Sequence, residues 1–345
     1  MKSIISVIGA GSWGTALAIS LAKKGHIVKL WMRNSTQFEQ MKKSRENIKY
    51  LSGVLLPENI MLFNHIEEAV IDTDLILLTV SSQAVRQVLK SFKDIVKENQ
   101  VIVNAAKGLE KSSLSRISEV VKEELPNNSF AVLSGPSHAE EVCRDMPTTL
   151  VVASDSKSVA EYVQDIFISP KLRIYINPDV IGVELGGALK NVIALGAGIS
   201  DGLGYGDNAK AALITRGIRE ISRLGQAIGS NINTFAGLSG IGDLIVTCTS
   251  MHSRNRRCGI KIGQGEKIED AIESVGMVVE GIITTNVAYE LSKKYDVEMP
   301  ITSEIYRIIN ENRDVREAVV NLMMRSRTHE MEEVVESNNH KWKYK

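Results

Sequence analysis

The segment Ile-Ile-Ser-Val-Ile-Gly-Ala-Gly-Ser-Trp-Gly-Thr-Ala-Leu-Ala (4–18) decides the fold of this chain. The run Ser3–Ile8 is typical of a strand, and Gly14–Lys24 has the pattern of a helix. The turn between them contains Gly9, Gly11 and Gly14 in the spacing Gly-x-Gly-x-x-Gly. Such glycines let the backbone turn tightly and approach a pyrophosphate at the positive end of the helix. The segment therefore predicts a dinucleotide site, with a nonspecific glycine-rich turn as the alternative.

Outward from this turn, short apolar runs alternate with amphipathic stretches. Helical patterns separate some of these runs, at Gln83–Phe92 and Leu114–Glu124. We expect further strands at Ile27–Trp31, Leu75–Val80, Val101–Ala105, Phe130–Leu133, Thr149–Ala153 and Arg173–Ile176. Strands that alternate with helices predict right-handed crossovers and a doubly wound, Rossmann-type α/β sheet.

The residue pattern changes after Asn177-Pro178, where long helical patterns with glycine-rich breaks replace the strand-like runs. We therefore expect a nucleotide-binding domain over 1–180 and a mainly helical, substrate-binding domain over 181–330. The remaining residues, 331–345, are polar and form a tail.

The composition excludes several classes of function. The 345 residues include 41 Lys+Arg and 41 Asp+Glu, so the net charge is zero, which disfavours nucleic-acid or membrane-surface binding. The three cysteines form no CxxC pair, and the six histidines show no metal-ligand spacing, so we expect no disulfide framework and no metal site. The glycine turn and the lysines that follow the N-terminal apolar run argue against a signal peptide, and no run has the roughly 18 uncharged apolar residues of a membrane helix. We expect a cytoplasmic protein.

The end of the second strand bears on the choice of cofactor. An NAD-preferring site usually has Asp or Glu about twenty residues after the glycine turn. This chain has Trp31-Met32-Arg33-Asn34 instead. Because an arginine can pair with a 2′-phosphate, we expect NADP(H) to be preferred and NAD(H) to be tolerated. The alternative is that Arg33 is a solvent-facing strand end.

Lys190 is the one charged side chain between Glu184 and Asp201. Burial of a lone amine in an apolar helix lowers its pKa toward the range of proton exchange near neutral pH. Gly182, Gly186, Ala194 and Gly198 lie on the same helix face as Lys190, which indicates that something approaches that face closely. The alternative is a lysine whose amine extends from a buried helix to its rim.

Two loops follow strands whose carboxyl ends should open on the same crevice. Lys107 follows one of these strands, and its amine could contact a phosphate or a substrate oxygen. The other loop, Gly135-Pro136-Ser137-His138-Ala139, offers backbone N–H groups and a hydroxyl. Both could instead be ordinary turns between a strand and a helix.

The second half of the chain carries a candidate anion site. Ser253, Arg254 and Asn255 offer hydroxyl, guanidinium and amide donors beside a probable helix start. A solvated basic face is the alternative. Asp243, in a glycine-rich apolar segment, could orient Lys190, bind a substrate hydroxyl or cap a helix. Glu280 could reach a cofactor, although the residues alone favour a surface charge.

Together these motifs resemble the bacterial NAD(P)-dependent glycerol-3-phosphate dehydrogenases over about residues 3–328. Several motifs in the right order are specific to the family, unlike any one of them alone. The matching segments are Gly-Ala-Gly-Ser-Trp-Gly-Thr-Ala-Leu-Ala (9–18), Ala-Lys-Gly-Leu-Glu (106–110), Ser-Gly-Pro-Ser (134–137), Glu-Leu-Gly-Gly-Ala-Leu-Lys-Asn (184–191), Gly-Asp-Leu (242–244), Ser-Arg-Asn-Arg-Arg (253–257) and Val-Val-Glu-Gly (278–281). Two loops, 50–53 and 80–83, have Ser where the family often has Pro, which leaves their local geometry in doubt.

The resemblance implies roles for individual residues. Lys190 matches the catalytic proton acceptor. The positions that match substrate contacts are Lys107, Gly135, Ser137, Lys190, Asp243, Ser253, Arg254 and Asn255. Those that match cofactor contacts, with the turn glycines, are Gly9, Gly11, Ser12, Trp13, Gly14, Arg33, Lys107, Ala139, Arg254, Val278 and Glu280.

The resemblance implies reversible NAD(P)H-dependent reduction of dihydroxyacetone phosphate to sn-glycerol 3-phosphate, which supplies phospholipid synthesis. It implies a small-molecule substrate, and we consider a homodimer as the assembly of the protein. One alternative is a β-hydroxyacid-type NADP dehydrogenase, whose substrates are carboxylates without a phosphate. The other is a non-catalytic NADPH-sensing protein.

Overall fold

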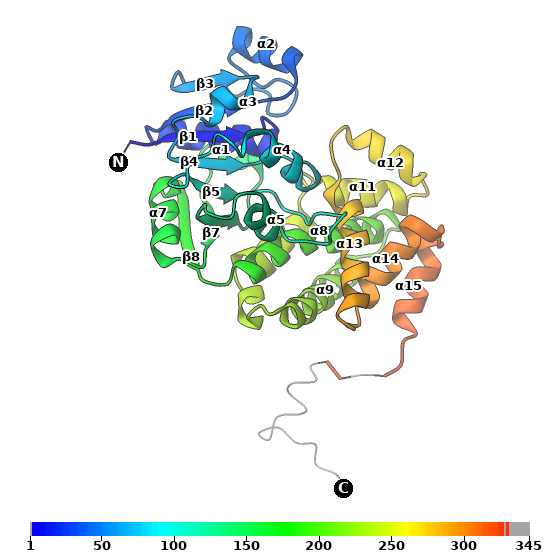
Figure 1. The fold of residues 1–345 in the computed structure, drawn as a ribbon. Coiled ribbons are helices and arrows are strands. Elements are labelled where there is room, and N and C mark those ends of the chain that lie inside the picture. The colour runs from blue at the N-terminus through cyan, green and yellow to red at the C-terminus, as the bar shows by residue number, and fades with distance from the viewer. Residues whose placement is uncertain (1, 328, 331–345) are drawn as a thin grey trace.

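The computed structural model describes residues 2–327 and 329–330, and its first half is built on one eight-stranded sheet. The strand order is β3-β2-β1-β4-β5-β6-β7-β8 (Figure 1). The strands are β1 (Ile4–Ile8), β2 (Ile27–Trp31), β3 (Ile60–Phe63), β4 (Leu75–Leu78), β5 (Val101–Asn104), β6 (Phe130–Ser134), β7 (Thr148–Ala153) and β8 (Leu172–Asn177). The first six strands are parallel to one another. Strand β7 runs antiparallel to β6, and β8 is parallel to β7.

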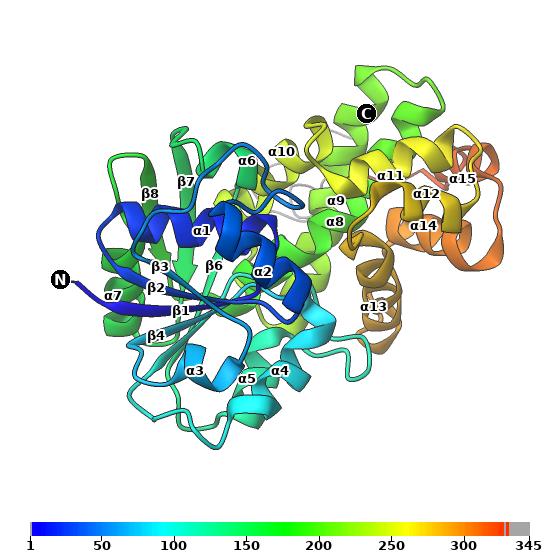
Figure 2. The ribbon, with the colours of Figure 1, turned by 90° about the horizontal axis from the view of Figure 1, so that it is seen from above.

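Helices cover both faces of this sheet because the apolar side chains of its central strands alternate between two cores. In β4, Leu75 and Leu77 lie in the core that includes α1 and α7, while Ile76 and Leu78 lie in the core that includes α3, α4 and α5. Figure 2 shows α1 and α6 on one side of the strands and α3, α4 and α5 on the other. The helices are α1 (Ser12–Lys23), α2 (Ser35–Ser44), α3 (Ile66–Val70), α4 (Val85–Phe92), α5 (Ile117–Glu124), α6 (Ala139–Val142) and α7 (Lys157–Phe167), with a short 3₁₀ turn η1 (Ser82–Ala84).

The second half is helical, so the predicted fold class is confirmed. Its central element is α8, and most of the helices that follow pack around it. The elements are α8 (Val180–Gly202), α9 (Asp207–Ile228), η2 (Ile232–Ala236), η3 (Leu238–Gly242), α10 (Asp243–Thr249), α11 (Arg254–Gly263), α12 (Ile268–Val275), α13 (Glu280–Lys294), α14 (Pro300–Glu311) and α15 (Val315–Met323).

The glycine face of α8 is occupied by the backbone of its neighbours. A Cβ on Gly198 would lie 2.1 Å from the carbonyl oxygen of Arg256, and one on Gly186 would lie 2.6 Å from that of Ser239. The contact is reciprocal, because a Cβ on Gly259 would lie 2.1 Å from the carbonyl oxygen of Leu195. The predicted close approach is therefore real, and it brings α11 and η3 against the face that carries Lys190.

Among the described residues, α8 is the one helix long and apolar enough to span a membrane by length and composition alone. Of its most apolar window, 94% is buried inside the protein. The apolar character of α8 is thus that of a core helix surrounded by other helices.

The predicted strands all form, although several are longer or shorter by one or two residues at an end. The strand β3 and the helices α2, α3, α6 and α7 were not predicted. The antiparallel direction of β7 is also a departure from a regular doubly wound sheet. The connection from β6 to β7, residues 135–147, contains the short helix α6, and the chain returns beside β6 in the opposite direction.

The three glycines of the first turn have different local surroundings. Gly9 has φ +119°, which favours glycine. A Cβ on Gly14 would lie 1.9 Å from the carbonyl oxygen of Gly9, so α1 can meet β1 closely only without a side chain there. Gly11 has an ordinary φ of −76°, and a Cβ on it would meet no atom of the described residues within 4 Å.

This contrast predicts that the same substitution has effects of different size at the two positions. Gly14→Ala should lower the free energy of unfolding by about 2 kcal/mol or more, because the new methyl group overlaps backbone. Gly11→Ala should change it by less than about 1 kcal/mol, because that backbone accepts alanine. Denaturant unfolding of both variants measures the difference. Equal destabilisation by the two substitutions would contradict the assigned packing.

Candidate functional site

Lys190 lies in the middle of α8 with 5% of its surface exposed. Its Nζ donates to Asp243 Oδ1 at 2.7 Å and to Thr247 Oγ1 at 2.6 Å. Both partners belong to α10, whose first residue is Asp243. The amine is therefore buried and ion-paired, and it does not extend to the rim of the helix.

Lys107 brings a second amine to the same carboxylate. From the loop after β5, its Nζ donates to Asp243 Oδ2 at 2.8 Å, to the carbonyl oxygen of Gly135 at 2.8 Å and to Ser137 Oγ at 3.1 Å. The sheet half and the helical half of the chain thus meet at one carboxylate that is only 1% exposed. Two lysines and one aspartate leave this cluster with a net positive charge that suits an anionic ligand.

The electrostatic surroundings bring Lys190 into a useful range for proton transfer. Burial and the charge of Lys107 lower the pKa of Lys190 to about 8, while the carboxylate of Asp243 opposes that change. Near neutral pH, an amine with this pKa is protonated and can still release its proton.

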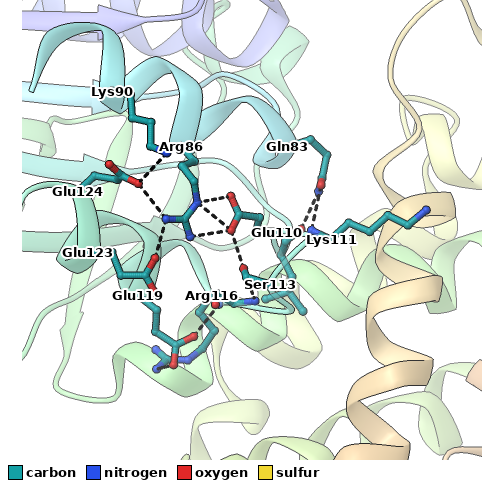
Figure 3. A network of polar contacts seen from close by, with 12 residues as sticks. Gln83, Arg86, Lys90, Glu110, Lys111, Ser113, Arg116, Glu119, Glu123 and Glu124 are labelled. Atoms are coloured by element: carbon teal, nitrogen blue, oxygen red, sulfur yellow. Dashed lines mark hydrogen bonds and ion pairs between the residues drawn. The ribbon is translucent and has the colours of Figure 1, made fainter.

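The loop that carries Lys107 is held by a network of charged groups (Figure 3). Arg86, on α4, donates from Nε and Nη2 to Glu110, and from Nη1 to Glu123 and Glu124 on α5. Gln83 donates to the carbonyl oxygen of Leu109 at 2.7 Å and accepts from the N–H of Lys111 at 3.0 Å. The loop is therefore anchored to η1 and α4, and through Arg86 to α5, which restricts the position of the Lys107 backbone.

A chain of amides connects this loop to the helical half. Asn191 donates to the carbonyl oxygen of Lys107 at 3.2 Å and accepts from Asn255 at 2.8 Å. Asn255 also accepts from the N–H of Gly281 at 2.8 Å. These bonds hold the start of α11 and the start of α13 against α8. Among the described residues, the amide of Asn255 uses one of its two hydrogens, so the other is available to a further partner.

Ser253 and Arg254 lie at the N-terminus of α11. Ser253 caps that helix by accepting from the N–H of Arg256 at 3.2 Å. Among the described residues, the side chain of Arg254 makes no hydrogen bond or ion pair, although burial lowers its pKa and the charges of Glu280 and Glu140 act on it. A half-buried guanidinium without a bonded partner is available to an anionic ligand.

Glu280 is not the surface charge that the residues alone favoured. Its carboxylate accepts from Ser82 Oγ at 2.9 Å and from the N–H of Ser82 at 3.3 Å, and burial raises its pKa. This contact joins α13 to the loop after β4. Gln83 then donates to Ser82 Oγ at 2.9 Å, which connects Glu280 to the network around Lys107.

The first turn of α1 has the features that a dinucleotide requires. No side chain among the described residues caps this helix, and the space beside Gly11 is open, so a pyrophosphate can approach its N–H groups. The indole Nε1 of Trp13 is buried without a hydrogen-bond partner in the described part of the chain. Ser12 lies 4.0 Å from the sulfur of Met277, which brings the segment before α13 to the turn. These groups fit a bound dinucleotide.

Other predicted cofactor positions are placed beside this turn or on the surface. The N–H of Gly9 donates to the carbonyl oxygen of Trp31 at 3.1 Å, so Arg33 follows the strand next to the glycine turn. Arg33 is exposed, and Val278 is 49% exposed. Ala139 is buried at the start of α6, which packs on α1. In the described part of the chain, none of these three side chains forms a hydrogen bond or ion pair with Lys107, Lys190 or Asp243.

Three residues that hold the two lysines or the surrounding loops in place were not predicted as site residues. Thr247 bonds Lys190, and its position four residues after Asp243 could have indicated a shared helix face. Asn191 is adjacent to Lys190, but its amide bonds the carbonyl oxygen of Lys107 and the side chain of Asn255 and not Asp243. Ser82 has its partner 198 residues away, and nothing local in the sequence indicates that contact.

Comparisons with known proteins give matches over most of this chain. The family model described as the N-terminus of NAD-dependent glycerol-3-phosphate dehydrogenase matches residues 4–160, and the corresponding C-terminus model matches 179–320. Glycerol-3-phosphate dehydrogenase [NAD(P)+] of Desulfitobacterium hafniense is 54% identical over 333 residues, covering 96% of this chain and 94% of that protein. The enzyme of the same name from Thermoanaerobacter sp. is 55% identical, covering 95% of this chain and 98% of the relative.

A solved structure gives the same result for the fold. The crystal structure of glycerol-3-phosphate dehydrogenase from Coxiella burnetii superimposes with a TM-score of 0.91 at 39% sequence identity. The match covers 94% of this chain and 99% of that one.

The shared carboxylate predicts how the pKa of Lys190 responds to substitution. Asp243→Asn should lower that pKa further, because the opposing negative charge is lost while burial and Lys107 remain. Thr247→Val removes the other hydrogen-bond partner without a charge, so it should have a smaller effect. The pH dependence of covalent modification of Lys190 measures both. An unchanged or higher pKa in Asp243→Asn would contradict the assignment.

Proposed function

This chain belongs to the NAD-dependent glycerol-3-phosphate dehydrogenase family, and from that premise we propose the reaction and the roles of its residues. The reaction is the reversible reduction of dihydroxyacetone phosphate by NAD(P)H and a proton, which gives sn-glycerol 3-phosphate and NAD(P)+. The observation that carries the assignment of roles is the buried pair of Lys190 and Asp243, whose carboxylate is shared with a second lysine, Lys107.

Lys190 is the acid and base of this proposal. When bound, the nicotinamide cofactor supplies the hydride in reduction and accepts it in oxidation. As the ketone oxygen gains negative charge, the Lys190 ammonium gives it a proton, and in reverse the neutral amine accepts one. Asp243 holds the amine in position, and Lys107 adds positive charge near the developing alkoxide.

The substrate phosphate is placed at the start of α11. Arg254 supplies a guanidinium, and Asn255 supplies its remaining amide hydrogen. Ser253 lies at the N-terminus of α11, whose N–H groups favour an anion. From the other side of the site, Gly135 and Ser137 contact the substrate through the loop that also bonds Lys107. The phosphate charge would then balance the net positive charge of the two lysines and Asp243.

The cofactor is placed along the carboxyl ends of β1, β2 and β4. Gly9, Gly11, Ser12, Trp13 and Gly14 hold the pyrophosphate and its neighbours through the first turn of α1. Arg33 binds the 2′-phosphate of NADP(H). The remaining contacts of the proposal are Lys107, Ala139, Arg254, Val278 and Glu280.

We extend the proposal to the organisation of the protein. Residues 1–180 form the cofactor domain and 181–330 the substrate and catalytic domain, and their apposition at Asp243 assembles the site. The protein is placed in the cytoplasm as a homodimer, without membrane insertion or nucleic-acid binding, where its product supplies phospholipid synthesis.

The direct test is oxidation of NADPH, and separately of NADH, in the presence of dihydroxyacetone phosphate. Turnover that depends on the triose phosphate is expected. Turnover with a β-keto carboxylate and none with the triose phosphate would favour a β-hydroxyacid-type dehydrogenase. Bound NADPH without any turnover would favour a sensing protein.

Lys190 should control the pH dependence of turnover. Since its pKa is about 8 and reduction needs the protonated amine, kcat/KM for reduction should fall above about that pH. Oxidation needs the neutral amine, so its rate should rise over the same range. Lys190→Ala should lower kcat by about 10²–10⁴-fold and remove this inflection, with cofactor binding retained. Activity within tenfold of wild type would refute the role.

Arg254 should control the affinity for the phosphorylated substrate. Arg254→Ala removes a charge-assisted contact worth about 2–5 kcal/mol, so the KM for dihydroxyacetone phosphate should rise at least about thirtyfold. Arg316→Ala, which removes an exposed arginine on α15, is the matched control and should leave that KM unchanged. Steady-state kinetics measures both. Equal KM values for Arg254→Ala and wild type would exclude Arg254 from the phosphate site.

Arg33 should control the choice between the two cofactors. Arg33→Ala should weaken NADPH binding by about tenfold, as expected for loss of a charge-assisted contact, and leave NADH binding nearly unchanged. Quenching of protein fluorescence by each cofactor gives the two dissociation constants. An unaltered ratio of these constants would show that Arg33 is only a solvent-facing strand end.

A further inference from the structure

Two histidines from the two halves of the chain meet beside the proposed substrate site. His138 precedes α6 in the loop that contains Gly135 and Ser137, and His252 immediately precedes Ser253. Their ring centroids are 5.3 Å apart with an interplanar angle of 51°. Each histidine is therefore next in sequence to a residue assigned to the substrate, one on each side of the site.

His138 has a buried polar atom with no bonding partner. Its Nε2 is inaccessible to solvent and makes no hydrogen bond with any described residue. By contrast, the buried His26 satisfies both ring nitrogens, through the N–H of Ser3 and the carbonyl oxygen of Ile166. A buried imidazole nitrogen without a partner is costly, and a ligand that supplies the partner removes that cost.

The charges around His138 determine its protonation state. Burial and the nearby charge of Lys190 lower its pKa, and His252 acts in the same direction, while Glu141 and Glu140 on α6 oppose them. His138 is thus neutral near pH 7 and carries one ring N–H.

Arg254 provides a second reference point. The charge of Glu140 acts on Arg254 as it does on His138. The contact between the two rings also brings the loop of Ser137 to the start of α11, where the phosphate is placed. A triose phosphate held between Ser137 and Arg254 would lie close to the imidazole.

We propose that His138 is a further substrate-binding residue, whose ring N–H donates to an oxygen of the bound triose phosphate. The inference rests on the proposed function. His252 supports the contact, because its ring lies against the imidazole across the junction of the two halves. The substrate oxygen is either on the phosphate or on the free hydroxyl, and both accept the same hydrogen bond.

The test is the KM for dihydroxyacetone phosphate in His138→Phe, which keeps a ring and loses its donor. We expect KM to rise about tenfold, with the melting temperature and the dissociation constant of NADPH nearly unchanged. His138→Gln restores an N–H near the position of Nε2 and should recover part of the loss. His65→Phe makes the same change at an exposed histidine and should leave KM unchanged.

Hydroxyacetone phosphate, which lacks the free hydroxyl, distinguishes the two oxygens. If the hydroxyl is the partner, wild type and His138→Phe should have equal KM values for this analogue. If the phosphate is the partner, the tenfold difference should persist. A KM within twofold of wild type for dihydroxyacetone phosphate in His138→Phe would overturn the inference.

Two further outcomes are separated by the design. If His138→Phe does not fold, His138→Ala removes the donor without added volume, and the same KM criterion applies. A fall in kcat and melting temperature at constant KM would assign a structural role and also overturn the inference. Absence of triose phosphate turnover in wild type would count against the proposed function itself.

Discussion

Two ammonium groups, those of Lys107 and Lys190, share the buried carboxylate of Asp243. Removal of these charges from water costs several kcal/mol for each ion, and close pairing is what makes it tolerable. The three residues come from the sheet half, from α8 and from α10, so these ion pairs help to join the two halves. They also leave a positive charge where the two halves join. The position of the site and its attraction for an anion therefore share one physical origin, whereas burial and the charge of Lys107 lower the pKa of Lys190 against the opposing effect of Asp243.

This arrangement depends on how closely backbones approach α8. The carbonyl oxygen of Ser239 packs where Gly186 has no side chain, one turn before Lys190. Further along the helix, Gly198 meets the backbone of α11 in the same way. A helical glycine costs roughly 1 kcal/mol relative to alanine, so this face gives up helix stability for proximity. Without that proximity, α10 and the start of α11 would lie too far out for their side chains to reach the amine.

The sequence contains most of the fold because apolar runs such as Leu75–Leu78 and the glycine turn are local signals. The direction of β7 is not local, since it is defined by the pairing of β7 with β6 and β8. The lone charge in α8 predicted Lys190, and Asp243 was recognised with helix capping as an alternative. Thr247 and Ser82 were not recognised as site residues, because their partners are defined by packing between segments far apart in sequence. Glu280 was misjudged from its neighbours for the same reason.

The burial of α8 has a consequence for the order in which the chain is made. The helices that cover it, α9, α10, α11, α13 and α14, all follow it in sequence. When residues 1–202 have left the ribosome, the sheet is complete and the start of α8 can pack on β6, but the rest of this long apolar helix lacks the helices that cover it. Such surfaces are prone to aggregation until their partners emerge, at about 5–20 residues per second. The apolar length of α8 therefore makes this interval of synthesis one of exposure to aggregation.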